Sequence, residues 1–459
     1  MYPNRSTHPP LQVLLGGVLL AAAGLAHASA FFSVNTTADL VDVNVSDGQC
    51  VSAANTCSLR AAIMQANHVS TAGVTTIIVP AGVYVLGPPV GDDGEASGDL
   101  NIVPLPGVAQ NLQILGAGAD RTIVDGNQTD RVLFINTLDN GVGGREARID
   151  GLTIRNGKRN DVGSSAGGLL NSGRLTIANC IIENNVSPSF GGGIAGEGDL
   201  TLINTTVRNN RAVLGGGIYI NAIGGHLTIR SSTINGNNAV VGGGIHVNGI
   251  FGGNIPTTAY IVNSTISTNA ANNDGGGIYA GGLSVTALYN VSVINNDADH
   301  DRDQTGGIGG GVFKDVGTDS RFIVVNSLIA NNTILDAPIF DDCNGTLEAY
   351  GWNLFGTTSG CSYTGNGTAA RGLVALNSIG PLQDNGGTTP THALLAGSAA
   401  IDSTFANPGC IDETGVFLGY DQRGAPRSAG LRCDVGAYEY GAIPPVSDRI
   451  FKSGFEVTP

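Results

Sequence analysis

The chain has 459 residues, enough for two to four domains, and it is rich in glycine (70 residues) and asparagine (41 residues). Only 13% of the residues are charged and the net charge is -15, which excludes a disordered solvating chain and argues against a nucleic-acid-binding protein. Collagen is excluded because the glycines have no three-residue period, and helical bundles are disfavoured because Gly and Asn are poor helix formers. A β protein with many Gly and Asn turns remains.

Residues 1–30 have the pattern of a secretory signal peptide. Arg5 and the N-terminal amine give a weakly positive start, residues 11–26 are apolar, and residues 28–30 form a small-residue cleavage site. The apolar run is shorter than the roughly 20 residues that a membrane-spanning helix needs. We therefore expect an exported protein, secreted or held at the cell surface, with no transmembrane segment in the mature chain.

Residues 31–73 are predicted to cap the N-terminal end of the fold with a short helix. Ser58 is a suitable N-cap residue, and Leu59, Ile63 and Ala66 would share one apolar face. Such a helix would cover the open end of a β structure and protect its unpaired strands.

Residues 74–340 contain a repeat with a spacing of 23 to 36 residues. One unit, residues 200–220, reads LTLINTTVRNNRAVLGGGIYI, and the next, residues 227–247, reads LTIRSSTINGNNAVVGGGIHV. Each unit holds three short stretches with the alternation of a strand: an LTI type, an STI type, and one after the glycine triplet. Strands this short must stack on neighbouring units to bury their apolar faces. The repeat therefore predicts an all-β fold, a parallel β-helix with three sheets.

One position between the LTI and STI stretches is nearly always Asn. It holds Ser231 in one unit, and we include a looser unit, LTIRNG, that begins at Leu152. The six asparagines are Asn156, Asn179, Asn204, Asn263, Asn290 and Asn326. Because Asn tolerates left-handed backbone geometry and stacked amides can hydrogen-bond to one another, we expect a tight turn with an asparagine ladder here.

Seven cysteines suit an oxidising compartment. Proximity alone suggests three disulfides, which are Cys50–Cys57, Cys343–Cys361 and Cys410–Cys433. Cys180 takes a position that is Thr or Ser in other units, so we expect an inert thiol inside the stack. Two of the pairs fall in residues 341–441, which we expect to close the C-terminal end of the coils before a linker and tail at 442–459.

These repeats resemble those of right-handed parallel β-helix proteins of the pectate-lyase-like superfamily. The glycine triplets also resemble the repeats of polymorphic outer membrane proteins. In the superfamily an asparagine ladder lies in the turn between the second and third sheets. The resemblance therefore implies that the strands after the glycine triplets form the first sheet, the LTI strands the second and the STI strands the third. It also implies that a substrate would lie along the first sheet.

Both ends carry further resemblances. CSLRAAI at residues 57–63 resembles the CSLREA domain at the start of secreted bacterial β-helix proteins, with Ala where that family has Glu. The tail RIFKSGFE at 449–456 resembles a terminal motif of exported bacterial proteins. Four segments resemble the choice-of-anchor Q domain: GPLQDNGG at 380–387, AAID at 399–402, DQRG at 421–424 and DVGAYE at 434–439. These resemblances imply architecture and export, and they assign no chemistry.

Ring-bearing residues follow the glycine triplets on successive units. They are Tyr219, His246, Tyr279 and Phe313, all expected to point outward from the first sheet. Flat rings at a spacing of ~4.8 Å could stack on sugar faces and so bind a polysaccharide. The alternative is that the rings stack on one another and stabilise the sheet surface.

Two acidic segments are candidate cation sites. Asp297, Asp299, Asp301 and Asp303 alternate in one loop, a pattern typical of oxygen ligands for Ca²⁺, although the Gly and Glu of an EF-hand loop are missing. A solvated acidic loop explains them equally well. A second group has the same ambiguity and comprises Asp92, Asp93, Glu95 and Asp99.

Catalytic residues are less clear. A polysaccharide lyase needs a basic side chain near the substrate, and Arg155, Lys158 and neighbouring Arg159, with Asp161 close by, are candidates. Adjacent aspartates at 341 and 342 resemble the paired Asp of polygalacturonase-like hydrolases, but the companion segments of that family are absent.

Two functional hypotheses follow. The first is an exported or cell-surface protein that binds polysaccharide or mediates adhesion, as a monomer, with a glycan and no nucleic acid as its partner. The second is a polysaccharide lyase or other glycan-acting enzyme that uses the first-sheet groove. A purely structural envelope protein is a third reading. Ca²⁺ is the one cofactor that the sequence suggests.

Overall fold

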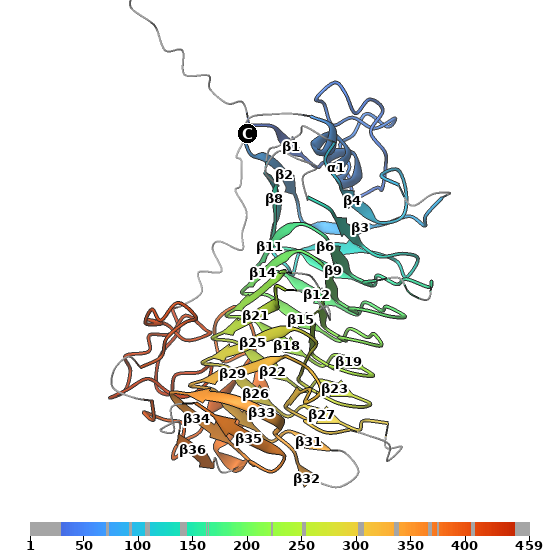
Figure 1. The fold of residues 1–459 in the computed structure, drawn as a ribbon. Coiled ribbons are helices and arrows are strands. Elements are labelled where there is room, and N and C mark those ends of the chain that lie inside the picture. Colours follow the sequence, from blue (N-terminus) through green and yellow to red (C-terminus); the bar gives the residue numbers. More distant parts are fainter. Residues whose placement is uncertain are drawn as a thin grey trace, which may run out of the picture.

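The computed structural model describes residues 29–445 except 70–72, 91–93, 106–110, 138–144, 162, 164, 222–223, 250–253, 302–306, 335–338, 366–369, 374–375 and 405–408. Most of the signal peptide expected at 1–30 and the tail resemblance at 449–456 therefore lie outside the described residues. Short strands stack as successive coils of an all-β parallel β-helix, which gives the rod in Figure 1. The predicted fold class is confirmed.

Three parallel sheets run along the rod. The first contains β4 (Leu100–Ile102), β7 (Leu133–Ile135), β10 (Leu169–Asn171), β13 (Ile194–Gly196), β16 (Ile218–Asn221), β20 (Ile245–Asn248), β24 (Ile278–Gly281) and β28 (Val312–Lys314). The second contains β1 (Phe31–Ser33), β2 (Thr75–Val79), β5 (Leu112–Gly116), β8 (Glu146–Asp150), β11 (Arg174–Ala178), β14 (Asp199–Ile203), β17 (His226–Arg230), β21 (Thr257–Val262), β25 (Ser284–Tyr289), β29 (Arg321–Val325), β33 (Cys343–Tyr350) and β35 (Cys361–Thr364). The third contains β3 (Gly82–Val85), β6 (Thr122–Asp125), β9 (Thr153–Arg155), β12 (Ile181–Glu183), β15 (Thr206–Arg208), β18 (Thr233–Asn235), β22 (Thr265–Ser267), β26 (Ser292–Ile294), β30 (Leu328–Ala330), β34 (Trp352–Phe355) and β36 (Ala370–Leu373).

Equivalent residues of neighbouring coils lie directly above one another. Leu200 pairs with Leu227 in the second sheet, and Ile218 pairs with Ile245 in the first. The inward residues of these strands are fully buried and form one continuous apolar core along the rod. Apolar residues of each strand therefore point into the coil and the residues between them point outward, as the alternation in the sequence predicts.

A short fourth ladder, which the sequence reading did not anticipate, lies between the third and first sheets. Its strands are β19 (Asn238–Ala239), β23 (Ala270–Ala271), β27 (Asp297–Ala298), β31 (Thr333–Ile334) and β32 (Ile339–Phe340). Isolated parallel bridges continue it toward the N-terminus, from Asn238 to Arg211 and from there to Val186. The final pairing, β31 with β32, is antiparallel.

The glycine triplets allow close approach between coils at the return to the first sheet. Gly215 has a φ of +66°, and a Cβ on Gly216 would lie 2.4 Å from the carbonyl oxygen of Asn238. Only glycine satisfies both conditions without displacing backbone. The repeated triplet is therefore a packing requirement of the rod.

The looser unit at Leu152 was placed in the wrong sheet. Thr153–Arg155 is the third-sheet strand β9, and the second-sheet strand of that coil is β8, whose Ala147 and Ile149 point into the core. The alternation of apolar residues in β8 is hard to recognise in the sequence because charged residues occupy the positions between them. Asn156 accordingly belongs to the turn after the third sheet, and Gly151 takes the predicted turn position with a φ of +68°.

The predicted one-residue turn is present, but the hydrogen-bonded ladder lies elsewhere. Asn179, Asn204 and Asn290 have φ near +50°, as expected, yet Asn204 Nδ2 lies 3.4 Å from Asn179 Oδ1 at an exposed edge. The continuous ladder follows the third sheet, where each buried amide donates to the next at 2.9–3.0 Å. It consists of Asn185, Asn210, Asn237, Asn269, Asn296 and Asn332.

The three predicted disulfides are present, with Cα–Cα distances of 5.1, 5.7 and 6.1 Å. Cys180 is a buried free thiol, as expected, and burial raises its pKa to about 12. Its backbone N–H donates to Thr205 Oγ1, and the N–H of Thr205 donates to Ser232 Oγ. Cys180 therefore begins a buried row of hydroxyl side chains.

The predicted N-terminal helix is α1 (Leu59–His68). Ser58 Oγ accepts a hydrogen bond from the N–H of Ala61 at 3.0 Å, which confirms the N-cap. Leu59 and Ile63 are buried, and the helix packs on β2 and β4 at the end of the rod (Figure 1). Arg60 is also buried and joins Asp39 through two hydrogen bonds of 2.7 and 3.0 Å, which fixes the cap to the preceding loop.

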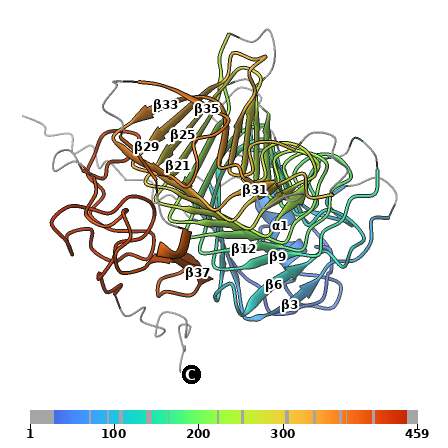
Figure 2. The same cartoon turned by 90° about the horizontal axis from the view of Figure 1, so that it is seen from below.

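The coils continue beyond the expected boundary at residue 340. Strands β33 to β36 add further parallel pairs, up to residue 373. Residues 376–445 then form a module that contains the hairpin β37 (Ile379–Gln383) and β38 (Thr391–Leu394). This module lies along the side of the rod, as Figure 2 shows, rather than over its end.

Polar contacts hold the module to the coils. Asn263 Nδ2 donates to the carbonyl of Tyr420 at 3.2 Å, and Asn290 Nδ2 donates to the carbonyl of Ile411 at 2.7 Å. Gln422 Nε2 donates to Thr233 Oγ1 at 2.8 Å. The asparagines of the predicted turn thus serve as docking contacts for the module.

No helix among the described residues is long and apolar enough to cross a membrane.

Candidate functional site

The predicted ring residues form a stack on the outside of the first sheet. Successive ring centroids of Tyr219, His246, Tyr279 and Phe313 lie 5.3, 4.5 and 5.2 Å apart. Phe190 extends the stack, with its centroid 4.8 Å from that of Tyr219. The structure brings all four predicted residues together.

The ring faces are nevertheless turned toward one another. Tyr219, His246 and Phe313 are only 7%, 5% and 8% exposed. Burial lowers the pKa of His246 to about 4, so its imidazole is neutral at physiological pH. These features favour the second interpretation of the stack, a stabilising row of rings, over a binding platform.

The acidic loop does not gather into a cluster within the described residues. Asp297 lies in β27 and accepts a hydrogen bond from Thr333, whereas Asp299 is buried with a φ of +52°. Asp301 is exposed, and Asp303 lies outside the described residues. Across the described part of the chain, no three His, Cys, Asp or Glu side chains are grouped so that they could hold a metal ion.

The second acidic segment flanks a pocket of about 600 Å³ beside the N-terminal cap. Asp92 and Asp93 lie outside the described residues. Glu95 is 3.1 Å from His68 Nε2, and Asp99 is ion-paired with Arg131 at 2.5 Å. Both carboxylates are therefore engaged in positioning the loop around the cap.

The candidate basic residues are held by neighbouring carboxylates. Arg155 Nε donates to Asp125 Oδ2 at 2.8 Å, and Arg159 Nη1 donates to Asp130 Oδ1 at 2.7 Å. Asp161 is 3.7 Å from Arg159, and Lys158 is half-buried on the bridge to Val186. Both guanidinium groups are thus engaged with carboxylates of the protein rather than directed at a substrate.

The adjacent aspartates have structural roles. Asp342 Oδ1 accepts a hydrogen bond from Asn332 Nδ2 at 2.8 Å, and Asp341 Oδ2 accepts one from the N–H of Gly309 at 2.6 Å. Burial raises the pKa of both carboxyl groups, that of Asp342 to about 6. Both carboxylates accept hydrogen bonds from the protein's own backbone or side-chain amides, whereas a catalytic pair would face a substrate.

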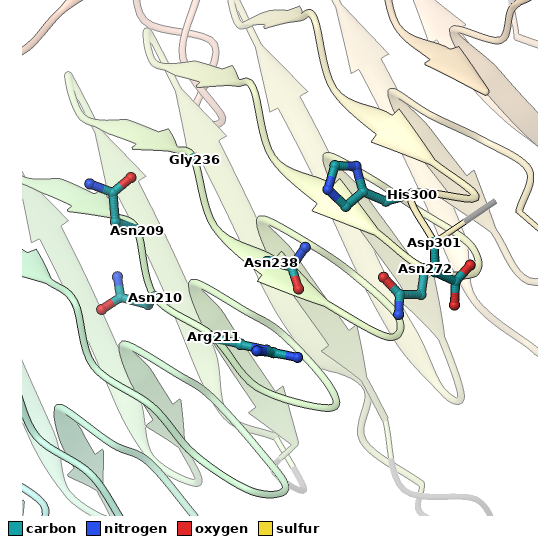
Figure 3. A pocket seen from close by; sticks show the side chains of 8 residues that line it. All are labelled: Asn209, Asn210, Arg211, Gly236, Asn238, Asn272, His300 and Asp301. Carbon is teal, nitrogen blue, oxygen red and sulfur yellow. The ribbon is translucent and has the colours of Figure 1, made fainter. Parts of the chain in front are cut away.

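An open polar pocket of about 490 Å³ lies across the fourth ladder and is shown in Figure 3. It is lined by Asn209, Asn210, Arg211, Gly236, Asn238, Asn272, His300 and Asp301. The exposed or half-exposed side chains among them present amides, a guanidinium, an imidazole and a carboxylate to one surface. Such a set can bond several hydroxyl groups and one carboxylate of a ligand.

The stacking of the coils positions these residues. Arg211 and Asn238 pair across a parallel bridge. The N–H of Asn272 donates to the carbonyl of Ala239 at 2.9 Å, and the N–H of His300 donates to that of Ala271 at 3.0 Å. In the described part of the chain, Arg211, His300 and Asp301 take part in no ion pair. The side chains of these three residues are therefore available to a ligand.

The sequence reading recognised only part of this pocket. Asp301 was considered as a cation ligand. Asn238, Asn272 and His300 were not singled out. The available signal was the Asn-rich segment after each STI stretch, because its buried member forms the ladder and its neighbours face outward.

Comparisons with known proteins give limited guidance. No family model matches the chain, and no curated protein matches it. A search of solved structures finds the crystal structure of pectate lyase Pel9A, with 14% sequence identity and a TM-score of 0.42. The match covers 90% of this chain and 97% of that one. The fold assignment rests on the strand pairing described above.

Proposed function

We propose that this chain is an exported protein that binds polysaccharide at the polar pocket. The observation that carries the proposal is a row of polar side chains on successive coils that form no ion pair with any described residue: Arg211, Asn238, Asn272 and His300. Four coils spaced by ~4.8 Å place these groups over about 14 Å along the rod. A ligand made of repeating polar units can contact each coil in turn.

The chemistry of the pocket suits an acidic sugar chain. Arg211 can bind a carboxylate through two parallel hydrogen bonds, and the amide of Asn238 can donate to and accept from sugar hydroxyls. His300 is exposed, so its imidazole nitrogens can hydrogen-bond to a ligand. The three disulfides support export to an oxidising compartment.

The CSLREA-like start, the choice-of-anchor Q-like module and the signal-peptide pattern at 1–30 belong to the same proposal. They support secretion or attachment at a cell surface, where the protein would act as a monomer that binds glycans or mediates adhesion. A β-helix with a module docked along its side has the extended shape that suits such a role (Figure 1).

The second candidate is a polysaccharide lyase that uses the first-sheet groove, with Ca²⁺ held by the loop at 297–303. Its best support is the set of basic residues Arg155, Lys158 and Arg159 at an early coil. The ion pairs of Arg155 with Asp125 and of Arg159 with Asp130 argue against a lyase.

A single comparison separates the two candidates. The mature chain is subjected to electrophoresis in gels with and without polygalacturonate, and unsaturated product is followed by ultraviolet absorbance, with Ca²⁺ or a chelator. We expect retardation without product, and we expect Arg211→Ala to weaken it about tenfold, the loss of one charge-assisted pair. Arg174→Ala is the matched control, since this arginine is exposed on the second sheet.

Chelator-sensitive product formation would establish the lyase instead. Absence of both retardation and product would refute acidic-glycan binding at the polar pocket.

A further inference from the structure

The outside of the second sheet carries tyrosines near the docked module. In one row of paired residues, Tyr260 is followed by Ala287 and Ile323 on successive coils. In the adjacent row, Tyr289 is followed by Val325 and Tyr350. We call these three tyrosines, Tyr260, Tyr289 and Tyr350, the tyrosine surface.

A small, buried side chain separates Tyr289 from Tyr350, whereas Tyr260 lies on the coil next to that of Tyr289. Ala287 and Val325 are 0% and 6% exposed, whereas Tyr350 is 37% exposed and Tyr260 and Tyr289 are half-exposed. Tyr289 and Tyr350 lie two coils apart in one row, which sets them about 10 Å apart along the rod. The rings of Tyr289 and Tyr350 thus project on either side of the small, buried Val325, unlike the closed stack on the first sheet.

Charged groups border the tyrosine surface on both sides. On one side, Arg321 binds Glu348 through two hydrogen bonds of 2.7 and 2.6 Å, and Tyr350 hydrogen-bonds to the same carboxylate. Figure 2 shows the module beside the second-sheet strands β21 to β33.

The other border comes from the module. Its segment at 411–417 supplies Asp412 and Glu413, which pair with Arg230 of the sheet. Asn290, the residue after Tyr289, donates a hydrogen bond to the carbonyl of Ile411 at 2.7 Å, which places Tyr289 beside this border. The module and the sheet therefore build the surface together.

We propose that the tyrosine surface is a second binding site, distinct from the polar pocket, for an extended neutral polysaccharide. Sugar rings present apolar C–H faces that stack on tyrosine rings, while their hydroxyls reach the bordering carboxylates and guanidinium groups. The separation of about 10 Å between Tyr289 and Tyr350 lets sugar units of one extended chain stack on both rings.

The charges on the borders select a neutral chain over an acidic one. Arg230 and Arg321 are already paired, and the borders hold three carboxylates, Glu348, Asp412 and Glu413, against these two cations. The chain as a whole also has a net charge of -15. A polyanion would be repelled here, whereas the unpaired Arg211 of the polar pocket would attract it. With two sites on different sheets, one molecule could link two polysaccharide strands.

The test uses the disulfide-bonded mature chain in gels that contain hydroxyethyl cellulose or glucomannan, with a polygalacturonate gel in parallel. We expect the neutral polymers to retard the protein. Tyr289→Ala and Tyr350→Ala should each weaken this retardation about tenfold, and the double variant should abolish it. Tyr289→Phe keeps the ring and should remain close to wild type.

Two control variants test whether the retardation arises at the tyrosine surface. Tyr440→Ala removes an exposed tyrosine of the module outside the surface and should change nothing. Arg211→Ala should weaken retardation by polygalacturonate alone, so failure of one site does not imply failure of the other. Thermal unfolding of each variant shows whether the fold is intact.

The proposal is overturned if neutral polymers do not retard the wild type, or if retardation survives in the double variant. It is also overturned if sedimentation shows self-association that the double variant loses, because the surface would then be an interface between copies of the chain.

Discussion

The asparagine ladder ends at Asn332, which donates hydrogen bonds to the buried carboxylate of Asp342. Both the side-chain amide and the backbone N–H of Asn332 donate to Asp342 Oδ1, at 2.8 and 3.0 Å. The other carboxylate oxygen accepts a hydrogen bond from the N–H of Thr357 at 2.6 Å. Asp342 thus supplies the final acceptor that a further asparagine would otherwise provide.

This position predicts a pH dependence of stability. Burial raises the pKa of Asp342 from 3.8 to about 6, so the folded state holds its proton more tightly than the unfolded state does. The contribution of this group is therefore greatest below pH 4 and is lost as the pH rises to 6. Asp342→Asn should remove the trend, which is up to roughly 3 kcal/mol across this range.

The measurement is the free energy of unfolding in urea at pH 4, 5, 6 and 7 for both proteins. The Asn side chain of the variant cannot accept the hydrogen bond from the N–H of Thr357, so we expect the variant to be less stable by a constant amount at every pH. Only the change of the free energy of unfolding with pH therefore tests the raised pKa. A difference between the two proteins that does not change with pH would contradict the raised pKa.

A ladder residue should matter more than its immediate neighbour. Asn237 donates to Asn269 Oδ1 at 2.9 Å and to the carbonyl of Val207 at 3.0 Å, and it accepts from Asn210. Asn237→Ala leaves buried partners unsatisfied and should reduce the free energy of unfolding by about 2–4 kcal/mol. Asn238→Ala, on the pocket surface, should cost less than about 0.5 kcal/mol. Equal effects in urea titrations would show that the ladder adds no stability.

The ladder also illustrates what the sequence could predict. The coil, its three sheets and its inward residues follow from the alternation in the repeats, because every strand repeats the same burial pattern. The location of the ladder was wrong, since asparagines with positive φ occur on both sides of the third sheet, at Asn179 and at Asn184. Asn179 has a positive φ and is exposed, whereas the ladder residue Asn185 follows the positive-φ residue Asn184 and is buried.

The sites were harder to predict because they depend on contacts between distant segments. The four ring residues lie in one row, as expected, but the sequence does not show that Phe190 joins them or that three of the four are buried. The sequence does not indicate that Arg230 pairs with Glu413, because the two residues are 183 positions apart. The tyrosine surface depends on where the C-terminal module docks, and the sequence placed that module at the end of the rod.

The stacked histidine predicts a pH trend opposite to that of Asp342. Burial lowers the pKa of His246 from 6.5 to about 4, so the unfolded state takes up a proton more readily. Its stabilising contribution is present above pH 6.5 and is lost as the pH falls toward 4. His246→Phe keeps a ring between Tyr219 and Tyr279 and should be more stable than wild type by roughly 2 kcal/mol at pH 5.

Urea unfolding at pH 5 and pH 8 checks this prediction, with a smaller difference expected at pH 8. Tyr219→Phe is the control for a ring replacement without a histidine. If the gain from His246→Phe were the same at both pH values, the histidine would not be the cause of the acid sensitivity.

Arg427 is predicted to hold the module against the coils. Its side chain is fully buried, and Nη2 donates to Asn263 Oδ1 at 2.7 Å and to the carbonyl of Gly436 at 2.8 Å. Nη1 lies 3.6 Å from Glu439 Oε2. Arg427→Met removes the link to Asn263 and leaves the acidic partner buried, a change that typically costs about 3–5 kcal/mol.

We expect this loss to appear in the module first, because the apolar cluster that it shares with the coils is small, whereas the coils share a continuous apolar core. Limited proteolysis should cleave Arg427→Met within residues 376–445 while the β-sheet circular dichroism of the coils persists. Arg432→Met changes an exposed arginine of the same module and should remain resistant. Simultaneous loss of the module and the coils in Arg427→Met would show instead that the two unfold as one cooperative unit.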